Sequence, residues 1–232
     1  MELVRYSRHA RGGHPREVVL LKGLPCVWGR CAFCDYIDDN TADEAWIRRV
    51  ADESLAQVTG EFGRLQLVSS GSIQELPPGV WEQVRGLLKA RGIGEFWTES
   101  YWAYRGRYAE ARRFFEVDTH LFLGVETFDD GLRNGVLNKS MHWSGPDEAA
   151  ALTDSICLMV GFRGQTRAMV RRDIDLLLTK FRYGIVNLFT PNRRSAGLMD
   201  EELKAWFAEE FAWLASHPNV DVLWKNTDLG GG

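Results

Sequence analysis

Short apolar runs alternate along the chain with longer segments whose apolar residues recur at helical spacing. The runs predicted as strands occupy residues 17–24, 64–70, 94–101, 119–127, 155–162, 184–192 and 220–226. The segments predicted as helices occupy residues 41–62, 80–92, 107–117, 145–154, 165–181 and 200–217. Strands that alternate with helices are typical of a parallel sheet, because a parallel connection must cross back over the sheet. The pattern predicts an α/β protein with six or seven parallel strands, in a sheet that is curled or closed.

Polar residues gather where the predicted strands end. They are Ser70, Gly71 and Ser72 after the second strand, Glu99 in the third, Glu126 in the fourth, Arg163 after the fifth and Asn187 in the sixth. In parallel α/β folds, ligands bind beyond the carboxyl ends of the strands, so these residues are expected to converge on one mouth. For any single residue, contact between a loop and water explains the polarity about equally well.

Length and composition favour one domain. The chain has 232 residues, 45% of them hydrophobic, and no low-complexity linker divides it. We therefore expect a single domain over residues 1–232, with an N-terminal extension at 1–16 and a C-terminal strand and tail at 217–232. No apolar run reaches about 18 residues and the first residues are charged, so a cytoplasmic protein is expected. A homodimer is compatible with this apolar content, although no pattern specifies one.

Three of the four cysteines, Cys26, Cys31 and Cys34, lie within nine residues directly after the first predicted strand. The fourth, Cys157, stands alone in an apolar run, as a small buried side chain does. In a reducing cytoplasm, clustered cysteines are more typical of metal or redox sites than of disulfides.

Three interpretations fit the cysteine cluster. A zinc site needs a fourth ligand, which His9, His14 or Asp35 would have to supply. A redox pair of Cys31 and Cys34 leaves Cys26 without a role. A [4Fe-4S] cluster held by three thiolates leaves one iron free for a small organic cofactor.

The segment PCVWGRCAFCDY resembles the cluster loop of the radical S-adenosylmethionine superfamily. Cys31, Phe33 and Cys34 match the Cys-x-aromatic-Cys part of that pattern. Four residues separate Cys26 from Cys31, where the family usually has three. The resemblance implies a partial (β/α)6 barrel with helices outside, a [4Fe-4S] cluster on the three cysteines and S-adenosylmethionine on its open iron. In the superfamily, a flavodoxin- or ferredoxin-type protein supplies the electron that cleaves this cofactor to a 5′-deoxyadenosyl radical.

Four later segments extend the resemblance over residues 17–192. They are VSSGSIQE, WTESY, LGVETFDDGLRNGVLNKSM with Lys139, and VNLFTPN. The last three are similar to a branch that contains elongator-type tRNA-modifying enzymes and archaeosine-forming lyases. The resemblance implies that backbone carbonyls at Ser70, Gly71 and Ser72 hold the methionine amino group.

The resemblance also suggests contacts for five other residues, each with a structural alternative. Phe33 would pack near the adenine, or belong to the core. Glu99 and Glu126 would accept from ribose hydroxyls or the methionine ammonium, or form buried ion pairs. Arg163 would bind the methionine carboxylate, or be a solvated loop arginine. Asn187 would contact the adenine edge, or cap its strand.

A small heterocyclic substrate fits better than a folded RNA, because the net charge is −4 and nucleic-acid binding normally needs a basic face. Compact relatives in the branch include the queuine lyases, which cut the side chain from a salvaged 7-deazaguanine base. A carboxylate can pair with the donors of such a base; the candidates are Asp35, Asp38, Asp39 and Asp228. The aromatic residues that could stack on it are Trp97, Tyr101, Trp102 and Tyr104. The alternatives are a radical enzyme that modifies tRNA and a zinc-stabilised binding module without catalysis.

Overall fold

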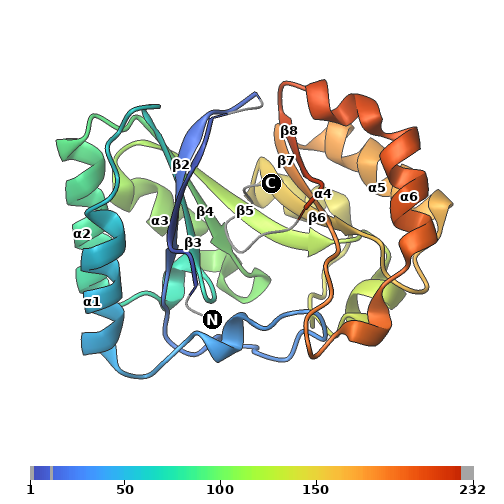
Figure 1. The fold of residues 1–232 in the computed structure, drawn as a ribbon, viewed down its shortest axis with the longest axis horizontal. Coiled ribbons are helices and arrows are strands. Elements are labelled where there is room, and N and C mark those ends of the chain that lie inside the picture. Colours follow the sequence, from blue (N-terminus) through green and yellow to red (C-terminus); the bar gives the residue numbers. More distant parts are fainter. Residues whose placement is uncertain (1–2, 11–12, 226–232) are drawn as a thin grey trace.

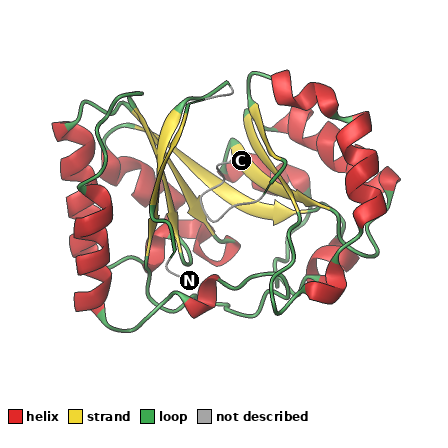
Figure 2. Ribbon diagram, in the orientation of Figure 1, coloured by secondary structure: helices red, strands yellow, loops and turns green. Residues whose placement is uncertain are grey.

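The computed structural model describes residues 3–10 and 13–225, which form one curled sheet with helices on its outer face (Figures 1 and 2). Within these residues the sheet has eight strands in the order β1 to β8. They are β1 (Tyr6–His9), β2 (Arg16–Leu21), β3 (Arg64–Ser69), β4 (Glu95–Ser100), β5 (Asp118–Glu126), β6 (Ser155–Val160), β7 (Tyr183–Leu188) and β8 (Val220–Leu223). β1 is antiparallel to β2, and every later neighbour is parallel. The predicted partial barrel of parallel strands is confirmed; β1 is an additional strand within the N-terminal extension.

Six α-helices are found in the described ranges, at the predicted places between strands. They are α1 (Glu44–Leu55), α2 (Pro78–Ala90), α3 (Tyr108–Phe115), α4 (Pro146–Leu152), α5 (Arg167–Lys180) and α6 (Glu201–Glu210). The helix predicted over residues 41–62 is shorter than expected. It begins after Asp43, whose side chain caps the Trp46 amide at 3.0 Å. None of the described helices is long and apolar enough to span a membrane.

The strands β2 to β7 are almost wholly buried, as parallel strands between two layers require. All six residues of β2 are buried. Inside the barrel, one cluster of buried side chains consists of Trp97, Phe122, Cys157, Tyr183 and Ile185. The loop from β2 to α1, which carries the three clustered cysteines, crosses the end of the sheet at the bottom of Figure 1. The cysteine loop therefore covers the carboxyl ends of the parallel strands.

An ion pair joins the two sides of the open barrel. Arg16 on β2 lies with its Nη1 atom 2.6 Å from Asp221 Oδ2 on β8, and both side chains are buried. These strands are far apart in the order of the sheet. Their contact is made across the barrel interior and not along a strand pair, so it depends on the curvature of the sheet.

Candidate active site

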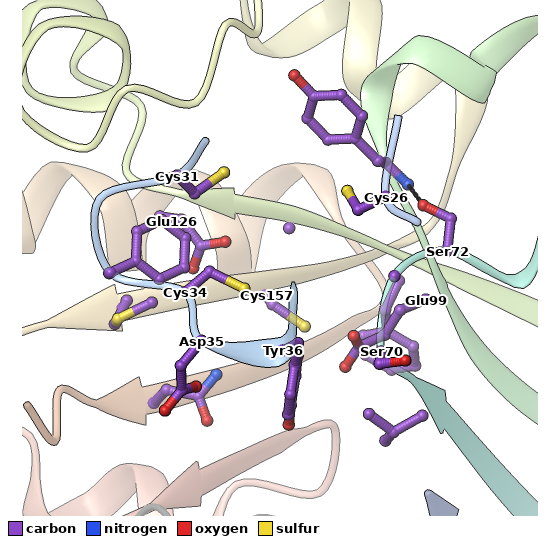
Figure 3. Close-up of a pocket in the computed structure, with 18 of the residues that line it drawn as sticks. Cys26, Cys31, Cys34, Asp35, Tyr36, Ser70, Ser72, Glu99, Glu126 and Cys157 are labelled. Carbon is purple, nitrogen blue, oxygen red and sulfur yellow. Dashed lines mark hydrogen bonds between the residues drawn. The ribbon is translucent and has the colours of Figure 1, made fainter. Parts of the chain in front are cut away.

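A cavity of about 410 Å³ lies behind the cysteine loop and extends into the barrel (Figure 3). This volume is in the range of small-molecule sites. The cavity brings together all of the predicted site residues except Arg163. They are Cys26, Cys31, Phe33, Cys34, Ser70, Gly71, Ser72, Glu99, Glu126 and Asn187. Residues from strand ends and from one loop, spread over most of the chain, thus meet in one space.

Glu75 holds the cysteine loop against the segment after β3. Its buried carboxylate accepts hydrogen bonds from the Val27 amide at 2.5 Å, the Ser72 amide at 2.6 Å and the Tyr104 hydroxyl at 3.1 Å. A buried carboxylate with this many donors fixes the chain segments that supply them. Sequence reasoning missed Glu75, although Ser72 and Glu75 have the spacing of a capping box.

Gly71 is required by this arrangement. A Cβ atom at residue 71 would collide with the Glu75 carboxylate and lie 3.8 Å from Cys26 Cβ. On either side of it, the two serine hydroxyls hold neighbouring segments. Ser70 Oγ accepts from the Gly23 amide at 2.8 Å, and Ser72 Oγ accepts from the Tyr101 amide at 3.0 Å. The backbone of residues 70–72 is therefore held beside the first cysteine.

The longer spacing between Cys26 and Cys31 accommodates a left-handed turn and an anchor. Gly29 has φ +59°, a conformation that favours glycine. The neighbouring Trp28 indole donates to the Asn138 carbonyl at 2.7 Å, which ties the loop to the segment after β5. The three sulfur-bearing residues still line one cavity despite the additional residue.

The three cysteines offer one thiolate each for separate metal ions. They are free thiols, and burial raises the pKa of Cys26 and Cys31 above its usual range and that of Cys34 to about 12. Within residues 3–10 and 13–225, no three Cys, His, Asp or Glu side chains are arranged to hold a single metal ion. Zinc draws its ligands to one point, whereas a [4Fe-4S] cluster takes one thiolate at each iron. The arrangement suits a cluster, whose positive irons would stabilise the thiolates against burial.

A buried ion pair stands beside the cysteines. Lys139 Nζ lies 2.5 Å from Glu126 Oε1 and 5.3 Å from the centre of the Phe33 ring. Burial lowers the pKa of Lys139, but the negative charge of Glu126 more than offsets it, so the pKa is raised. Glu126 has φ +63°, at a bulge that follows Gly124. A Cβ on Gly124 would lie 2.9 Å from both charged groups, so the glycine leaves room for the pair.

Glu99 has a different environment from Glu126. No described residue donates a hydrogen bond to its half-buried carboxylate, which faces the cavity (Figure 3). Burial, followed by the negative charge of Glu126, raises the pKa of Glu99 to about 7, although Lys139 acts in the opposite direction. Glu99 is therefore able to accept a hydrogen bond or to carry a proton near neutral pH.

Arg163 lies outside the cavity. Its side chain is exposed and donates to the Met199 carbonyl at 3.4 Å, because the loop after β6 packs on residues 198 and 199. Arg163 is therefore not placed to make the expected contact with a methionine carboxylate inside the cavity. The lining residues that were given no ligand role from the sequence include Arg16, Gln66, Lys139 and Cys157. Arg16 begins β2 and Gln66 lies within β3, so neither is at the carboxyl end of a strand, where the sequence predicted ligand contacts.

Of the four candidate aspartates, only Asp35 lines the cavity among those that the structure describes. Asp38 pairs with Arg193 and Arg194 instead. Asp39 pairs with Arg5 and Lys22. Ion pairing thus occupies both carboxylates, and Asp228 lies outside the described residues.

The four aromatic candidates also separate. Tyr101 lines the cavity. Trp97 is buried below it in the barrel cluster, and Trp102 packs edge-on against Trp143. The Tyr104 hydroxyl is used by Glu75. Contacts within the protein, rather than stacking on a ligand, explain all but Tyr101.

Comparison with solved structures finds a protein that matches the chain over its full length. It is 38% identical to the queuine lyase from Clostridium spiroforme bound to S-adenosylmethionine and queuine, with a TM-score of 0.94 and complete coverage of both chains. SuiB from Streptococcus suis bound to S-adenosylmethionine has a TM-score of 0.51 at 11% identity, over 91% of this chain and 51% of SuiB. The second likeness concerns the fold alone. No protein-family model and no curated protein sequence matches the chain.

Proposed function

The chain belongs to the queuine lyase family of radical S-adenosylmethionine enzymes, and we propose that it cleaves the side chain of queuine, a 7-deazaguanine base. One observation carries this proposal. One cavity contains the three cysteines together with the other predicted site residues except Arg163, and the whole chain matches a lyase whose structure contains queuine.

The donor set suits the cofactors of this chemistry. Cys26, Cys31 and Cys34 would each hold one iron of a [4Fe-4S] cluster, with S-adenosylmethionine beside it. Bound there, the two cofactors supply a 5′-deoxyadenosyl radical, the hydrogen-abstracting reagent that side chains lack. A one-electron donor of the flavodoxin or ferredoxin type would supply the electron.

The protein itself positions the reactants and excludes water. Glu75 keeps the backbone of residues 70–72 close to Cys26. The carbonyl oxygens of residues 70–72 would accept hydrogen bonds there from the methionine ammonium. Glu126, held by Lys139, would accept from a ribose hydroxyl. Phe33, under the Lys139 ammonium, would cover the adenine, and Asn187 would contact its edge.

The two alternatives are less well supported. A tRNA substrate would need a basic face at the mouth. Arg193 and Arg194, next to the lining segment 190–192, are engaged by Asp38, and Arg30 is the one exposed cation within the cysteine loop. A zinc-stabilised module would need ligands that converge on one ion, and the described residues contain no such set. A cytoplasmic location and a homodimer stay predictions from the sequence.

The test is anaerobic reconstitution with iron and sulfide, followed by reduction in the presence of S-adenosylmethionine with and without queuine. We expect 5′-deoxyadenosine to form faster with queuine, and mass spectrometry to show the base without its side chain. Cys31→Ala is expected to lose iron and activity, whereas Cys157→Ala, the matched cysteine change, is expected to keep the iron content. Deoxyadenosine formation at the same rate without queuine would contradict the proposal.

A further inference from the structure

The cysteine loop has an outer side that turns away from the cavity. Val27 and Arg30 lie on this side, and neither of them lines the cavity. Val27 is 56% exposed, and Arg30 is exposed as well. Arg30 directly precedes Cys31 in the chain. A protein that contacts Arg30 would therefore lie next to one of the cysteines that would hold the cluster.

A second segment lies beside the cysteine loop and extends this outer side. The Asn138 carbonyl accepts from the Trp28 indole at 2.7 Å, and the Asn138 side chain donates to the Arg30 carbonyl at 2.8 Å. The Ala32 amide donates to the Leu137 carbonyl at 3.0 Å. Asn138 has φ +50°, in the left-handed region that asparagine tolerates better than most residues. The two segments are therefore fixed side by side as one surface.

The second segment adds an apolar group to this surface. It follows η4 (Gly131–Val136), a short π-helical segment whose last residue, Val136, is 41% exposed and does not line the cavity. Val27 and Val136 are two of the six large apolar side chains that are exposed within residues 3–10 and 13–225. Exposed apolar groups that gather on one face are typical of an interaction site.

Two cations without ion pairs accompany the apolar groups. Arg30 forms no ion pair in the described part of the chain, and its guanidinium lies 5.6 Å from the centre of the Trp28 ring. Arg163 is exposed, and no described carboxylate pairs with it either. A Cβ on its neighbour Gly164 would lie 3.9 Å from Leu132 Cδ1, which places the Arg163 loop beside η4.

The acids nearest to these cations are already engaged or face elsewhere. Asp130 pairs with the buried Arg133 at 2.7 Å, and Asp129 accepts from the Leu132 amide at 2.9 Å. Asp35 lines the cavity. The unpaired charge on the outer side is therefore positive, although the chain as a whole carries −4. Two cations suit a small acidic protein better than a nucleic acid, which needs a broad basic face.

We propose that the surface formed by Val27, Arg30, Val136 and Arg163 is the docking surface for the one-electron donor, a small acidic redox protein. This inference rests on the proposed function and gives its electron donor a place on the chain. Acidic groups around the donor's cofactor would pair with the two arginines, and the two valines would form the apolar centre of the contact. Electron-transfer encounters bury less than about 1,200 Å², so a surface built from three short segments is large enough.

The position beside Cys31 is what makes this surface suitable for electron transfer. The donor loses one electron, the site accepts it, and no atom or proton is transferred at this surface. Because the surface lies outside the cavity, a docked donor would leave the cofactors and the substrate in place.

The first test compares two reductants for deoxyadenosine formation by the reconstituted protein with S-adenosylmethionine and queuine. Dithionite is a small ion that needs no docking surface, whereas a reduced acidic flavodoxin needs one. In Arg30→Glu and in Arg163→Glu, we expect the apparent KM for flavodoxin to rise about tenfold at low salt, because acidic groups then face a carboxylate. The rate with dithionite is expected to stay within about twofold of wild type.

Arg91→Glu is the matched control. Arg91 is an exposed cation at the end of α2, on the opposite end of the barrel. We expect this variant to keep both the KM for flavodoxin and the dithionite rate within about twofold. If Arg30→Glu and Arg163→Glu lose the dithionite rate in the same proportion as the flavodoxin rate, the loss does not come from docking and the proposal is overturned.

The second test measures binding without turnover. Calorimetric titration of the reconstituted protein with oxidised flavodoxin gives a Kd. We expect Val136→Asp to raise this Kd about tenfold, and added salt to weaken binding to wild type more than to Arg30→Glu. Val4→Asp, the same change at a valine that is 63% exposed, is expected to leave the Kd within about twofold.

The outcomes separate the two proposals. If wild type cleaves queuine with dithionite, but all three surface variants use and bind flavodoxin as wild type does, the docking surface is overturned and the function stands. A change of oligomeric state in Val136→Asp, seen by light scattering with flavodoxin binding unchanged, would assign the surface to a second copy of the chain and overturn the proposal. If wild type forms no deoxyadenosine with dithionite and queuine, the proposed function fails, and the docking surface fails with it.

Discussion

Lys139 Nζ and Glu126 Oε1 lie 2.5 Å apart, and both residues are buried next to the cysteine loop. Breaking a buried pair by removing one partner leaves an uncompensated charge. Lys139→Met is therefore expected to lower the free energy of unfolding by about 3–5 kcal/mol, measured by urea denaturation. Lys180→Met breaks a solvent-exposed pair with Asp147, also at 2.5 Å, and is expected to cost less than about 1 kcal/mol. Equal losses in the two variants would show that burial of the pair has no energetic effect.

Gly71→Ala is expected to disturb the cysteine loop, since its Cβ would collide with the Glu75 carboxylate. Moving Glu75 breaks its hydrogen bonds to the Val27 and Ser72 amides, so we expect a loss of about 1–3 kcal/mol and fewer irons per chain after reconstitution. Gly86→Ala is the matched control. Its Cβ meets open space within α2, where alanine stabilises by about 0.5–1 kcal/mol. Normal iron loading in Gly71→Ala would refute the proposed role of this glycine.

Glu99 makes stability depend on pH. Its pKa is raised to about 7 from an ordinary 4.5, so the folded protein binds more protons than the unfolded chain between these values. The free energy of unfolding then falls as the pH rises. The contribution is fully present below about pH 4.5 and is lost as the pH rises through 7. Its upper limit is about 3 kcal/mol, reduced because the carboxylate is only half-buried.

The measurement compares wild type with Glu99→Gln, which does not titrate, by urea denaturation from pH 4 to 8. We expect wild type to lose stability relative to the variant over this interval. The charged groups that act on Glu99 are Glu126 and Lys139. A difference between the two proteins that does not change with pH would contradict the assignment.

Asp221→Asn is expected to leave Arg16 buried without its counter-charge. Removing one partner of such a pair costs about 3–5 kcal/mol, and here it also breaks the contact between β2 and β8 across the barrel. Thermal and urea unfolding both measure the loss. Asp175→Asn, at an exposed position on α5, is expected to change stability by less than about 0.5 kcal/mol. Similar stability of the two variants would mean that the pair does not hold the barrel together.

Much of the fold could be predicted from local patterning. The strands β2 to β8 follow from apolar runs, and the helices between them follow from helical spacing. β1 was missed because its sequence, YSRH, has no apolar run. It is a strand because its backbone pairs with β2, a tertiary contact that leaves no hydrophobic pattern.

The candidate site was predicted where residues follow strand ends. Ser70, Gly71 and Glu126 line the cavity because parallel strands bring their carboxyl ends to one edge. The same rule placed Arg163 at that edge too, but its side chain turns to Met199 and to solvent. Asp38 and Asp39 were equally plausible as ligands until their arginine and lysine partners were known.

The sequence by itself determined that three thiols share one short loop after a strand, because chain connectivity keeps Cys26, Cys31 and Cys34 together in any fold. Only the tertiary structure decided which charges meet. Lys139 pairs with Glu126 at a bulge in β5, and Arg16 reaches both Gln66 and Asp221 because the sheet curls. Periodicity reports which face of a strand is buried, whereas the partner of a buried polar group depends on the curvature that brings distant strands together.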